Sequence, residues 1–410
     1  MKNNQKRENK INTSAFDTND YQKMTYEDRI NSVITKVKGC IEGDVTIINK
    51  LGFGGLGTVY RVNTTISGES VDIAQKAFYE GKDLKRAEDD YVELYNNWQI
   101  TKYISKNIKT IAKDPFLCEC IEKVPLLFTT HEQRRILEKE NTPEEEYIAA
   151  QKASELKEGI FFEIKGNQNL EEIISSKKNE LTFEDRRKLL LDILMGGTIL
   201  DKVGIIQRDL NCENIQIDIH SNDGKPRAYL VDFGKAVHKA IIHIFDDDES
   251  KKRDYCGPFF YSAPPEAYDD EEKEEIIFGD KYNSFNIGLL MFPLFFDVEG
   301  ENLMYNFKWS NNEDIVHHRK NLFECLDEIV DKLNKNRDKP YNVKQISFIK
   351  KIMSKLINTN VDKRANAEKV ARKIYEKETE IIQQIAKERL SFNDMQKCNN
   401  YQMMTKNILD

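Results

Sequence analysis

Three polar side chains in the middle of the chain have the types and the spacing that phosphoryl transfer needs. Asp209 and Asn214 lie five positions apart, and Asp232 follows in the next β-rich run. Transfer of a phosphoryl group requires a carboxylate that orients the attacking hydroxyl and accepts its proton, and oxygen ligands for the Mg²⁺ that neutralises the phosphates. Asp209 fits the first role, whereas Asn214 and Asp232 fit the second. A single Asp in a loop is more often a turn or cap residue, so the inference rests on the set.

A glycine-rich stretch lies far upstream of these residues. The pattern G-x-G-x-x-G-x-V is made by Gly52, Gly54, Gly57 and Val59, and it follows Leu51. A dinucleotide-binding loop would lead into a helix, but β-branched residues follow here, which favours a loop between two strands. Such a loop lets backbone N–H groups lie over a triphosphate without clashes from Cβ atoms, and Val59 would then cover a purine. The alternative is an ordinary hairpin turn.

Lys76 lies about 20 residues beyond the glycine loop, in the β-rich run that also contains Ala74. A lysine on a half-buried strand is costly unless it is paired, so we expect a carboxylate from the next helix beside it. Glu88 is the favoured partner, because apolar residues follow it at +3, +4 and +7. Glu93 is the alternative, but asparagines follow it at +3 and +4, which suggests a more solvated face. If neither pairs with it, Lys76 is a strand-edge lysine that extends to water.

With these motifs in this order, the sequence resembles the eukaryotic-type protein kinase family. The resemblance covers about residues 44–375 and rests on the glycine loop, Ala74, Lys76, Arg208-Asp209, Asn214, Asp232-Phe233-Gly234, the segment Cys256–Glu266 and Arg364. It implies an α+β, bilobal fold with a small β-rich N-lobe and a larger helical C-lobe. It also implies ATP and Mg²⁺ as cofactors and proteins as substrates.

The resemblance assigns further contacts to individual residues. The adenine is expected to hydrogen-bond the backbone of Glu163 and Lys165, with Phe162 as the gatekeeper before them. Lys76 is expected to hold the α- and β-phosphates. Glu266 and Arg364, about 100 residues apart, are expected to form a buried ion pair, because the planar guanidinium matches a carboxylate.

The sequence departs from the family pattern at five positions. Gln207 replaces His or Tyr, Asn211 replaces the lysine that contacts the γ-phosphate in Ser/Thr kinases, and Pro258 replaces its threonine partner. Asn283 replaces a buried helix Asp that braces the catalytic loop, and Pro265 is inserted before Glu266. These changes affect the substrate class more than nucleotide binding. They leave two alternatives: a nucleotide-binding pseudokinase that acts as a scaffold, and a small-molecule kinase of the aminoglycoside or choline type.

The periodicity divides the chain into three parts. We expect a polar tail and a short helix over residues 1–43, a kinase-like domain over 44–375, and a helical extension over 376–410. The N-lobe is expected over about 44–164, with a charged surface insertion at about 129–158, and the C-lobe over about 165–375. The apolar run Phe116–Val124 is expected to form a strand.

Composition excludes several classes of protein. A net charge of −8 disfavours broad nucleic-acid binding, which usually shows a basic stripe. The longest apolar run, Ile287–Phe296, is about half a membrane span, and no apolar signal peptide opens the chain. The seven cysteines are scattered, which favours reduced thiols and a cytoplasmic location. The Lys/Asn/Ile-rich composition suits an AT-rich genome, such as that of a parasite or of a bacterium that exports proteins into a host cell.

From the motifs and the family resemblance together, we expect an ATP- and Mg²⁺-dependent protein kinase directed at Ser/Thr.

Overall fold

The computed structural model describes most of the region that carries these motifs. It describes residues 26–53, 57–78, 84–156, 158–176, 181–219, 221, 224–241, 264, 281–298 and 321–380. Gly54 of the glycine loop, Pro258, Pro265 and Glu266 lie outside the described residues, as does the expected helical extension beyond residue 380.

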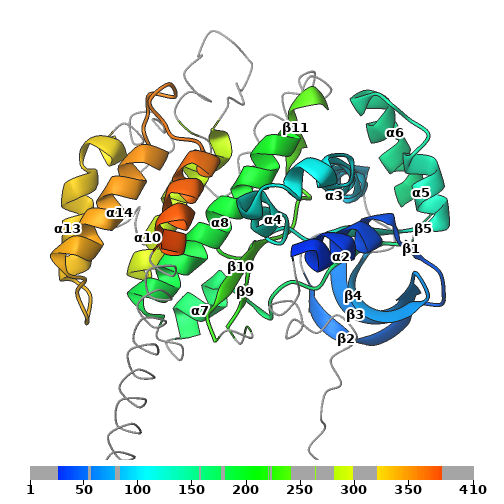
Figure 1. The fold of residues 1–410 in the computed structure, drawn as a ribbon, viewed down its shortest axis with the longest axis horizontal. Helices are drawn as coiled ribbons and strands as arrows, with labels where there is room; N and C mark the ends of the chain where they lie inside the picture. Colours follow the sequence, from blue (N-terminus) through cyan, green and yellow to red (C-terminus); the bar gives the residue numbers. More distant parts are fainter. Residues whose placement is uncertain are drawn as a thin grey trace, which may run out of the picture.

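A curved six-stranded sheet forms the smaller lobe (Figure 1). Its strands are β1 (Cys40–Ile41), β2 (Thr46–Phe53), β3 (Gly57–Ile66), β4 (Glu69–Phe78), β5 (Leu127–Thr130) and β6 (Ile160–Phe162), in the order β1-β5-β6-β4-β3-β2. β1 also pairs with β3, so the sheet curls back on itself. Ser67 and Gly68 both have positive φ, 52° and 79°, which is the geometry of the tight turns that join antiparallel strands such as β3 and β4.

Two helices flank this sheet, α2 (Tyr26–Lys38) and α3 (Leu84–Ile111), and α4 (Pro115–Ile121) packs on α3 and on the larger lobe. The strand expected at Phe116–Val124 is therefore wrong, because the segment starts as a helix. Asp114 caps it by accepting from the N–H groups of Phe116 and Leu117, and Pro115 occupies the first turn, where a missing N–H costs nothing. These start signals outweigh the short apolar run.

The charged segment between β5 and β6 forms two helices, α5 (His131–Leu137) and α6 (Pro143–Ser154), each opened by a capping box. The insertion is therefore helical, and one of its faces is buried. The inward face of α6 carries small buried residues, including Ala149, Ala150 and Ala153, and it packs against α3 (Figure 1). The run of glutamates at its start is the acidic first turn that favours a helix N-terminus.

Arg134 of α5 links the insertion to the helix α2 at the start of the described chain. Its guanidinium donates to the carbonyls of Val37, Lys38 and Gly39, where α2 ends. These are carbonyls that a helix leaves without an intrahelical partner. Arg134 therefore caps α2 from a position almost a hundred residues away in sequence.

The larger lobe is built around α8 (Phe183–Val203), whose residues from Leu189 to Leu200 are all buried. α8 packs against α10 (Tyr282–Phe296) and a helix over 367–380 (Figure 1). α7 (Leu170–Ser176) and α14 (Val343–Leu356) pack on α10, and α13 (Leu326–Lys335) packs on α14. A Cβ atom at Gly196 would lie 2.7 Å from Leu230, and one at Gly197 would lie 2.6 Å from Ile287. These two glycines let a strand and a helix approach α8 closely.

Two small sheets carry the loops between the lobes. One contains β7 (Gln168–Asn169), β9 (Ile215–Asp218) and β10 (Arg227–Leu230), and the other pairs β8 (Ile205–Ile206) with β11 (Val237–His238). The expected bilobal α+β architecture is confirmed. None of the helices in the described ranges is long and apolar enough to cross a membrane.

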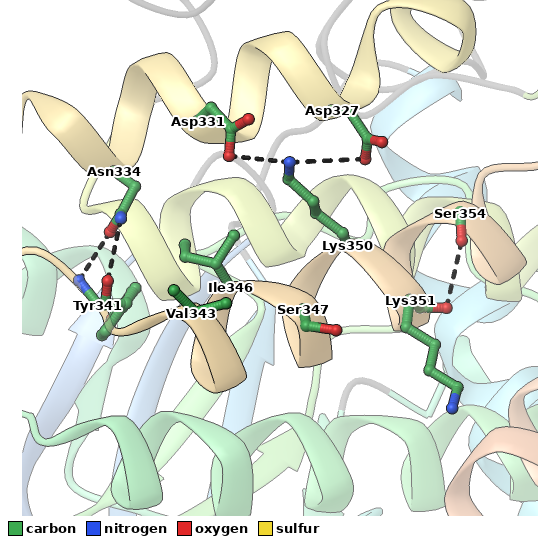
Figure 2. A pocket seen from close by; sticks show the side chains of 10 residues that line it. All are labelled: Asp327, Asp331, Asn334, Tyr341, Val343, Ile346, Ser347, Lys350, Lys351 and Ser354. Carbon is green, nitrogen blue, oxygen red and sulfur yellow. Dashed lines mark hydrogen bonds and ion pairs between the residues drawn. The ribbon is translucent and has the colours of Figure 1, made fainter.

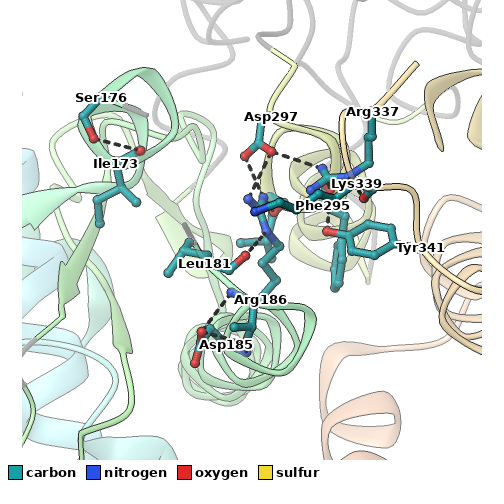
Figure 3. Close-up of polar contacts among 12 residues, drawn as sticks. Ile173, Ser176, Leu181, Asp185, Arg186, Phe295, Asp297, Arg337, Lys339 and Tyr341 are labelled. Carbon is teal, nitrogen blue, oxygen red and sulfur yellow. Dashed lines mark hydrogen bonds and ion pairs between the residues drawn. The ribbon is translucent and has the colours of Figure 1, made fainter. Parts of the chain in front are cut away.

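Charged side chains close the far end of the helical lobe. Arg186 of α8 donates to both carboxylate oxygens of Asp297, at 2.7 and 3.0 Å, and to the carbonyl of Leu294 (Figure 3). Arg337 donates to Asp297 at 3.1 Å and to the carbonyl of Phe295, and its guanidinium lies over the ring of Tyr341. The two arginines thus cap the C-terminus of α10, where the helix dipole favours cations.

A neighbouring groove runs between α13 and α14. Lys350 of α14 lies between Asp327 and Asp331 of α13, at 3.8 and 2.8 Å (Figure 2). Val343 at the start of α14 lines the same groove and is 86% exposed. The ion pairs hold the two helices together along the rim of the groove.

Candidate active site

Asp209 lies in the loop that joins β8 to β9, and the buried Asn283 of α10 braces this loop. Asn283 accepts a hydrogen bond from the N–H of Gln207 at 2.9 Å and donates to the carbonyl of Ile205 and to the carboxylate of Asp201, both at 2.8 Å. An aspartate at this position could accept but could not donate. The amide therefore keeps the bracing contact to the loop backbone and adds two others.

Gln207 connects this loop to the segment that carries Asp232. Its side-chain amide is fully buried and donates to the carbonyl of Asp232 at 2.6 Å. Gln207 thus makes a buried contact at the position where the family has His or Tyr. Arg208 adds a second buried link between the two loops, because its Nε donates to the carbonyl of Lys235.

The carboxylate of Asp209 has partners on both oxygens. The amide of Asn211 donates to Oδ1 at 3.0 Å, and the ammonium of Lys235 lies 3.1 Å from Oδ2. Asn214 donates from its amide to the backbone carbonyl of Asp209 at 2.7 Å, which leaves Oδ1 of Asn214 as the side-chain oxygen for other ligands. The expected proton acceptor and amide ligand thus lie next to each other.

Asp232 adopts a left-handed backbone conformation, with φ at 59°, and 41% of its side chain is exposed. Such a conformation is uncommon outside glycine and is often found at functional sites. Its Oδ1 accepts from the N–H of Gly234 at 3.2 Å and lies 3.7 Å from the ammonium of Lys76. The turn therefore leaves the carboxylate partly exposed beside Lys76, at the junction of the two lobes (the cleft).

Lys76 of β4 forms a short ion pair with Glu93 of α3, with 2.5 Å between Nζ and Oε2. Their side chains are only 7% and 3% exposed. The expectation that Glu88 is this partner is wrong, because Glu93 occupies the position beside Lys76. The side chain of Glu88 lies outside the described residues.

The asparagines that follow Glu93 explain the error. Asn96 and Asn97 are 0% and 2% exposed, so the face that suggested solvent is buried. Asn97 donates to the carbonyl of Glu93 in its own helix, whereas Asn96 donates to the carbonyls of Phe233 and Ala236, at 3.0 and 2.9 Å. Asn96 therefore links α3 to the backbone that follows Asp232, a role that sequence reasoning missed. Its signal was a pair of poor helix formers within a long helix.

The opposite side of α3 is held by α6. The buried carboxylate of Glu146 accepts from Gln99 at 2.6 Å and forms an ion pair with Lys102. Tyr147 packs edge-on against Tyr91 and Tyr95 of α3, with ring centroids 5.3 and 5.6 Å apart. The inserted helices thus help to fix the helix that carries Glu93.

The strands around the glycine loop have the expected arrangement. β2 and β3 form an antiparallel pair in which Gly52 lies opposite Val59, so the loop joins two strands. Val59 lies opposite Lys76, and the buried Ala74 lies opposite Phe162 on β6. The residues expected around the nucleotide therefore come from adjacent strands.

Glu163, which follows β6, lies in a cluster of charges. Its carboxylate contacts Lys36 of α2 at 2.6 Å and Lys165 at 3.0 Å. Although burial acts against the charged form, the two lysines dominate and lower the pKa of Glu163 to about 2. Its backbone N–H donates to the carbonyl of Leu126, so an adenine amino group would have to bind the carbonyl of Glu163.

Arg364 is buried in the helical lobe, with 1% exposure. It donates to the carbonyl of Asn358 at 2.8 Å, and its guanidinium lies 4.8 Å from the ring centroid of Phe285. The burial agrees with the expectation for one half of the ion pair. The other half, Glu266, lies outside the described residues, so the pair stays a prediction.

Comparison with known proteins identifies the family. The model of the protein kinase domain matches residues 146–375, which is more than half of the 410-residue chain. A probable serine/threonine-protein kinase of Dictyostelium discoideum is 30% identical over 135 residues, which cover 32% of this chain and 22% of the relative. The match therefore spans about a fifth of that relative's length. Since the family match covers the loops of Asp209 and Asp232, the chain belongs to the protein kinase family.

Proposed function

We propose that this protein kinase uses ATP and Mg²⁺ and transfers the γ-phosphate to Ser or Thr hydroxyls of protein substrates. The observation that carries the proposal is the position of Lys76, whose ammonium lies between the carboxylates of Glu93 and Asp232. A kinase needs this lysine to be fixed by a glutamate of the adjacent helix and to lie near the metal-binding aspartate. The name of the Dictyostelium relative supports Ser/Thr specificity.

The residues around the cleft fit a Mg²⁺ ion bound together with nucleotide phosphates. Mg²⁺ usually takes one or two protein carboxylates and completes its shell with phosphate and water oxygens. Asp232 offers a partly exposed carboxylate, and Asn214 offers an amide oxygen. Within the described ranges, no group of three or more His, Cys, Asp and Glu side chains forms a site that would hold a metal without a nucleotide. When bound, the ion would neutralise phosphate charge.

The chain's own residues supply the remaining parts of the reaction. Asp209 orients the substrate hydroxyl, whose oxygen forms a bond to the γ-phosphorus. The bond between that phosphorus and the β–γ bridging oxygen breaks, and its electrons leave with ADP. The hydroxyl proton passes to the Asp209 carboxylate. Lys76 holds the α- and β-phosphates, and the backbone of Glu163 and Lys165 holds the adenine.

Incubation with labelled ATP, Mg²⁺ and a panel of generic protein substrates tests this function, followed by analysis of the phosphorylated residues. Label on serine and threonine supports the proposal, and label on tyrosine alone contradicts its specificity. Asp209→Asn is the control, because it keeps the shape of the side chain and removes the proton acceptor. If the variant transfers as fast as the wild type, Asp209 does not have the proposed role.

A binding-only pseudokinase is the second candidate. Two features of the environment of Asp209 favour it. Both carboxylate oxygens already have protein partners, Asn211 and Lys235, and Asn211 replaces the lysine of the family pattern. A thermal shift with ATP that grows with Mg²⁺, in a wild-type protein that never transfers phosphate, would support it. Transfer that Asp209→Asn stops would exclude it.

We also propose the Glu266–Arg364 ion pair as a brace of the helical lobe. The burial of Arg364 supports it, because a buried guanidinium normally has a carboxylate partner. Removing one side of a buried pair costs about 3–5 kcal/mol, and the double variant should cost much less than the sum of the single variants. Additive losses of a few tenths of a kcal/mol would contradict the pair.

The proposal for the cellular setting rests on the cysteines and the charge. The five described cysteines are free thiols, which supports an intracellular location, and the net charge of −8 supports protein rather than nucleic-acid partners. We also propose that the kinase domain ends near residue 375 and that its lobes meet at residues 164–165.

A further inference from the structure

Lys235 places a flexible positive charge beside the proposed proton acceptor. It follows Gly234 directly, and its ammonium lies 3.1 Å from Oδ2 of Asp209. Its backbone carbonyl accepts from Nε of Arg208 at 2.7 Å, while its side chain is 44% exposed. The backbone is therefore anchored, and the ammonium can turn between Asp209 and the cleft.

The charges around the cleft create a need for such a cation. Asp209 and Asp232 are both carboxylates, and a nucleotide would add several negative charges between them. Lys76 already contacts Glu93 at 2.5 Å, and it lies at the Asp232 side. Asn211, the second partner of Asp209, is a neutral amide. In the described part of the chain, Lys235 is the cation that forms an ion pair with Asp209.

We propose that Lys235 contacts the transferred phosphoryl group and supplies the charge that Asn211 does not. The inference rests on the proposed function. An ammonium has three N–H donors, so one can remain on Asp209 while the others reach phosphate oxygens. Charge spreads over the equatorial oxygens as the bond to the β–γ bridging oxygen breaks, and a cation there stabilises that state. The hydroxyl proton still passes to Asp209, so Lys235 donates hydrogen bonds and transfers no proton.

Turnover of single and double variants tests the role in transfer. Lys235→Ala should lower kcat about 100-fold, as expected for the loss of one donor to a developing charge. Adding Asn211→Lys to Lys235→Ala should recover at least about tenfold of that loss, because it puts an ammonium back beside Asp209. Lys202→Ala is the matched control: Lys202 also pairs with a carboxylate, Glu368 at 2.8 Å, but it lies at the end of α8.

Nucleotide affinity provides a readout that does not depend on turnover. Lys235→Ala should weaken binding of ATP severalfold and leave ADP binding unchanged, because only ATP carries the γ-phosphate. Lys202→Ala should change neither affinity. Calorimetric titration of wild type and variants with each nucleotide and Mg²⁺ measures this selectivity.

The outcomes separate the two proposals. If the wild type binds ATP but transfers no phosphate, the proposed function fails, while a selective loss of ATP binding in Lys235→Ala still supports the contact. If Lys235→Ala keeps kcat within about twofold of the wild type and keeps its ATP-to-ADP selectivity, the inference is wrong. It is also wrong if kcat falls but selectivity is unchanged and Asn211→Lys restores nothing, since Lys235 would then only hold Asp209 in place. A wild type that binds neither nucleotide overturns both.

Discussion

Two clusters of carboxylates and cations in this molecule contain similar groups, but they differ in whether a further ion can bind. In the cleft, one lysine, Lys76, serves two carboxylates, and one of these is 41% exposed. At the end of α10, two arginines serve one carboxylate, Asp297, and also donate to the last carbonyls of the helix. The first cluster has an excess of negative charge, so a metal ion can still bind. The second has one cation more than it has carboxylates, and its remaining donors bind the last carbonyls of α10.

The choice of cation follows the same division. An ammonium is a compact charge on a flexible stem and can exchange partners, whereas a guanidinium is a planar fork that suits fixed bidentate contacts. Arg186 uses this fork on both oxygens of Asp297 (Figure 3). We therefore expect variants in the cleft to affect activity first, and variants at the end of α10 to affect stability first.

The largest expected effect is that of Lys76→Met on transfer. Losing a donor to the phosphates should reduce kcat/KM by at least about 10²–10³-fold. The variant also leaves the buried Glu93 without its lysine contact, so some loss of thermal stability should accompany the loss of activity. Steady-state kinetics on protein shown to be folded by circular dichroism measures the first effect. Near wild-type turnover would contradict the nucleotide site.

Glu163 has two lysines on one carboxylate, so, like the cluster at the end of α10, it should contribute mainly to stability. Its pKa is lowered from 4.5 to about 2, so the folded state favours the charged form. This contribution, on the order of 3 kcal/mol, is present above pH 4.5 and is lost as the pH falls toward about 2. Urea unfolding of the wild type and Glu163→Gln across pH 2–6 should give a stability difference that is constant above about pH 5 and shrinks below it. A difference independent of pH would contradict the lowered pKa.

Arg186→Ala should lower the free energy of unfolding by about 2–3 kcal/mol, because it leaves Asp297 and the carbonyl of Leu294 with fewer donors. Activity per folded molecule should not change. Arg187→Ala is the matched control, since its side chain is more exposed and its pairs lie near the surface, so it should cost less than about 1 kcal/mol. Equal losses for the two variants would show that the buried fork adds nothing.

Asn96→Leu should have a smaller effect, which we expect on the use of Mg²⁺. Without the amide, the carbonyls of Phe233 and Ala236 lose a donor, and the turn that presents Asp232 is less fixed. We expect the Mg²⁺ concentration for half-maximal activity to rise severalfold, or about 1 kcal/mol. Asn97→Leu removes an equally buried amide that bonds only within α3 in the described contacts, and it should leave this concentration unchanged. If both variants shift it equally, packing alone explains the effect.

The sequence predicted the parts of the site that depend on local spacing. Asp209, Asn214 and Asp232 lie in short loops beside strands, so their order along the chain was enough to group them. The choice between Glu88 and Glu93 depended instead on which face of α3 is buried. The asparagines after Glu93 were misleading because both are buried: Asn97 bonds within α3, and the partners of Asn96 are backbone carbonyls more than 130 residues away. No pattern within α3 itself records such partners.

The same limit explains the errors in the fold. The insertion was rich in charge because its capping boxes and its acidic first turn are polar, while the packing surface of α6 combines small alanines with Glu146 and Tyr147. α4 is only seven residues long, so its cap decided its structure and its apolar content did not. Lys235 carried no signal beyond its position after Gly234, because its contact with Asp209 forms only when two loops meet.

Arg134 has a consequence for how the protein opens and closes locally. Its contacts with the end of α2, together with the pair between Lys36 and Glu163, connect α2, the insertion and the segment after β6. Segments joined in this way tend to exchange their amide hydrogens as one cooperative unit. A chain shortened to begin at residue 44 would remove one side of each contact. The amides of α5 and of the residues after β6 should then lose protection together, which would place the working boundary of the domain before α2.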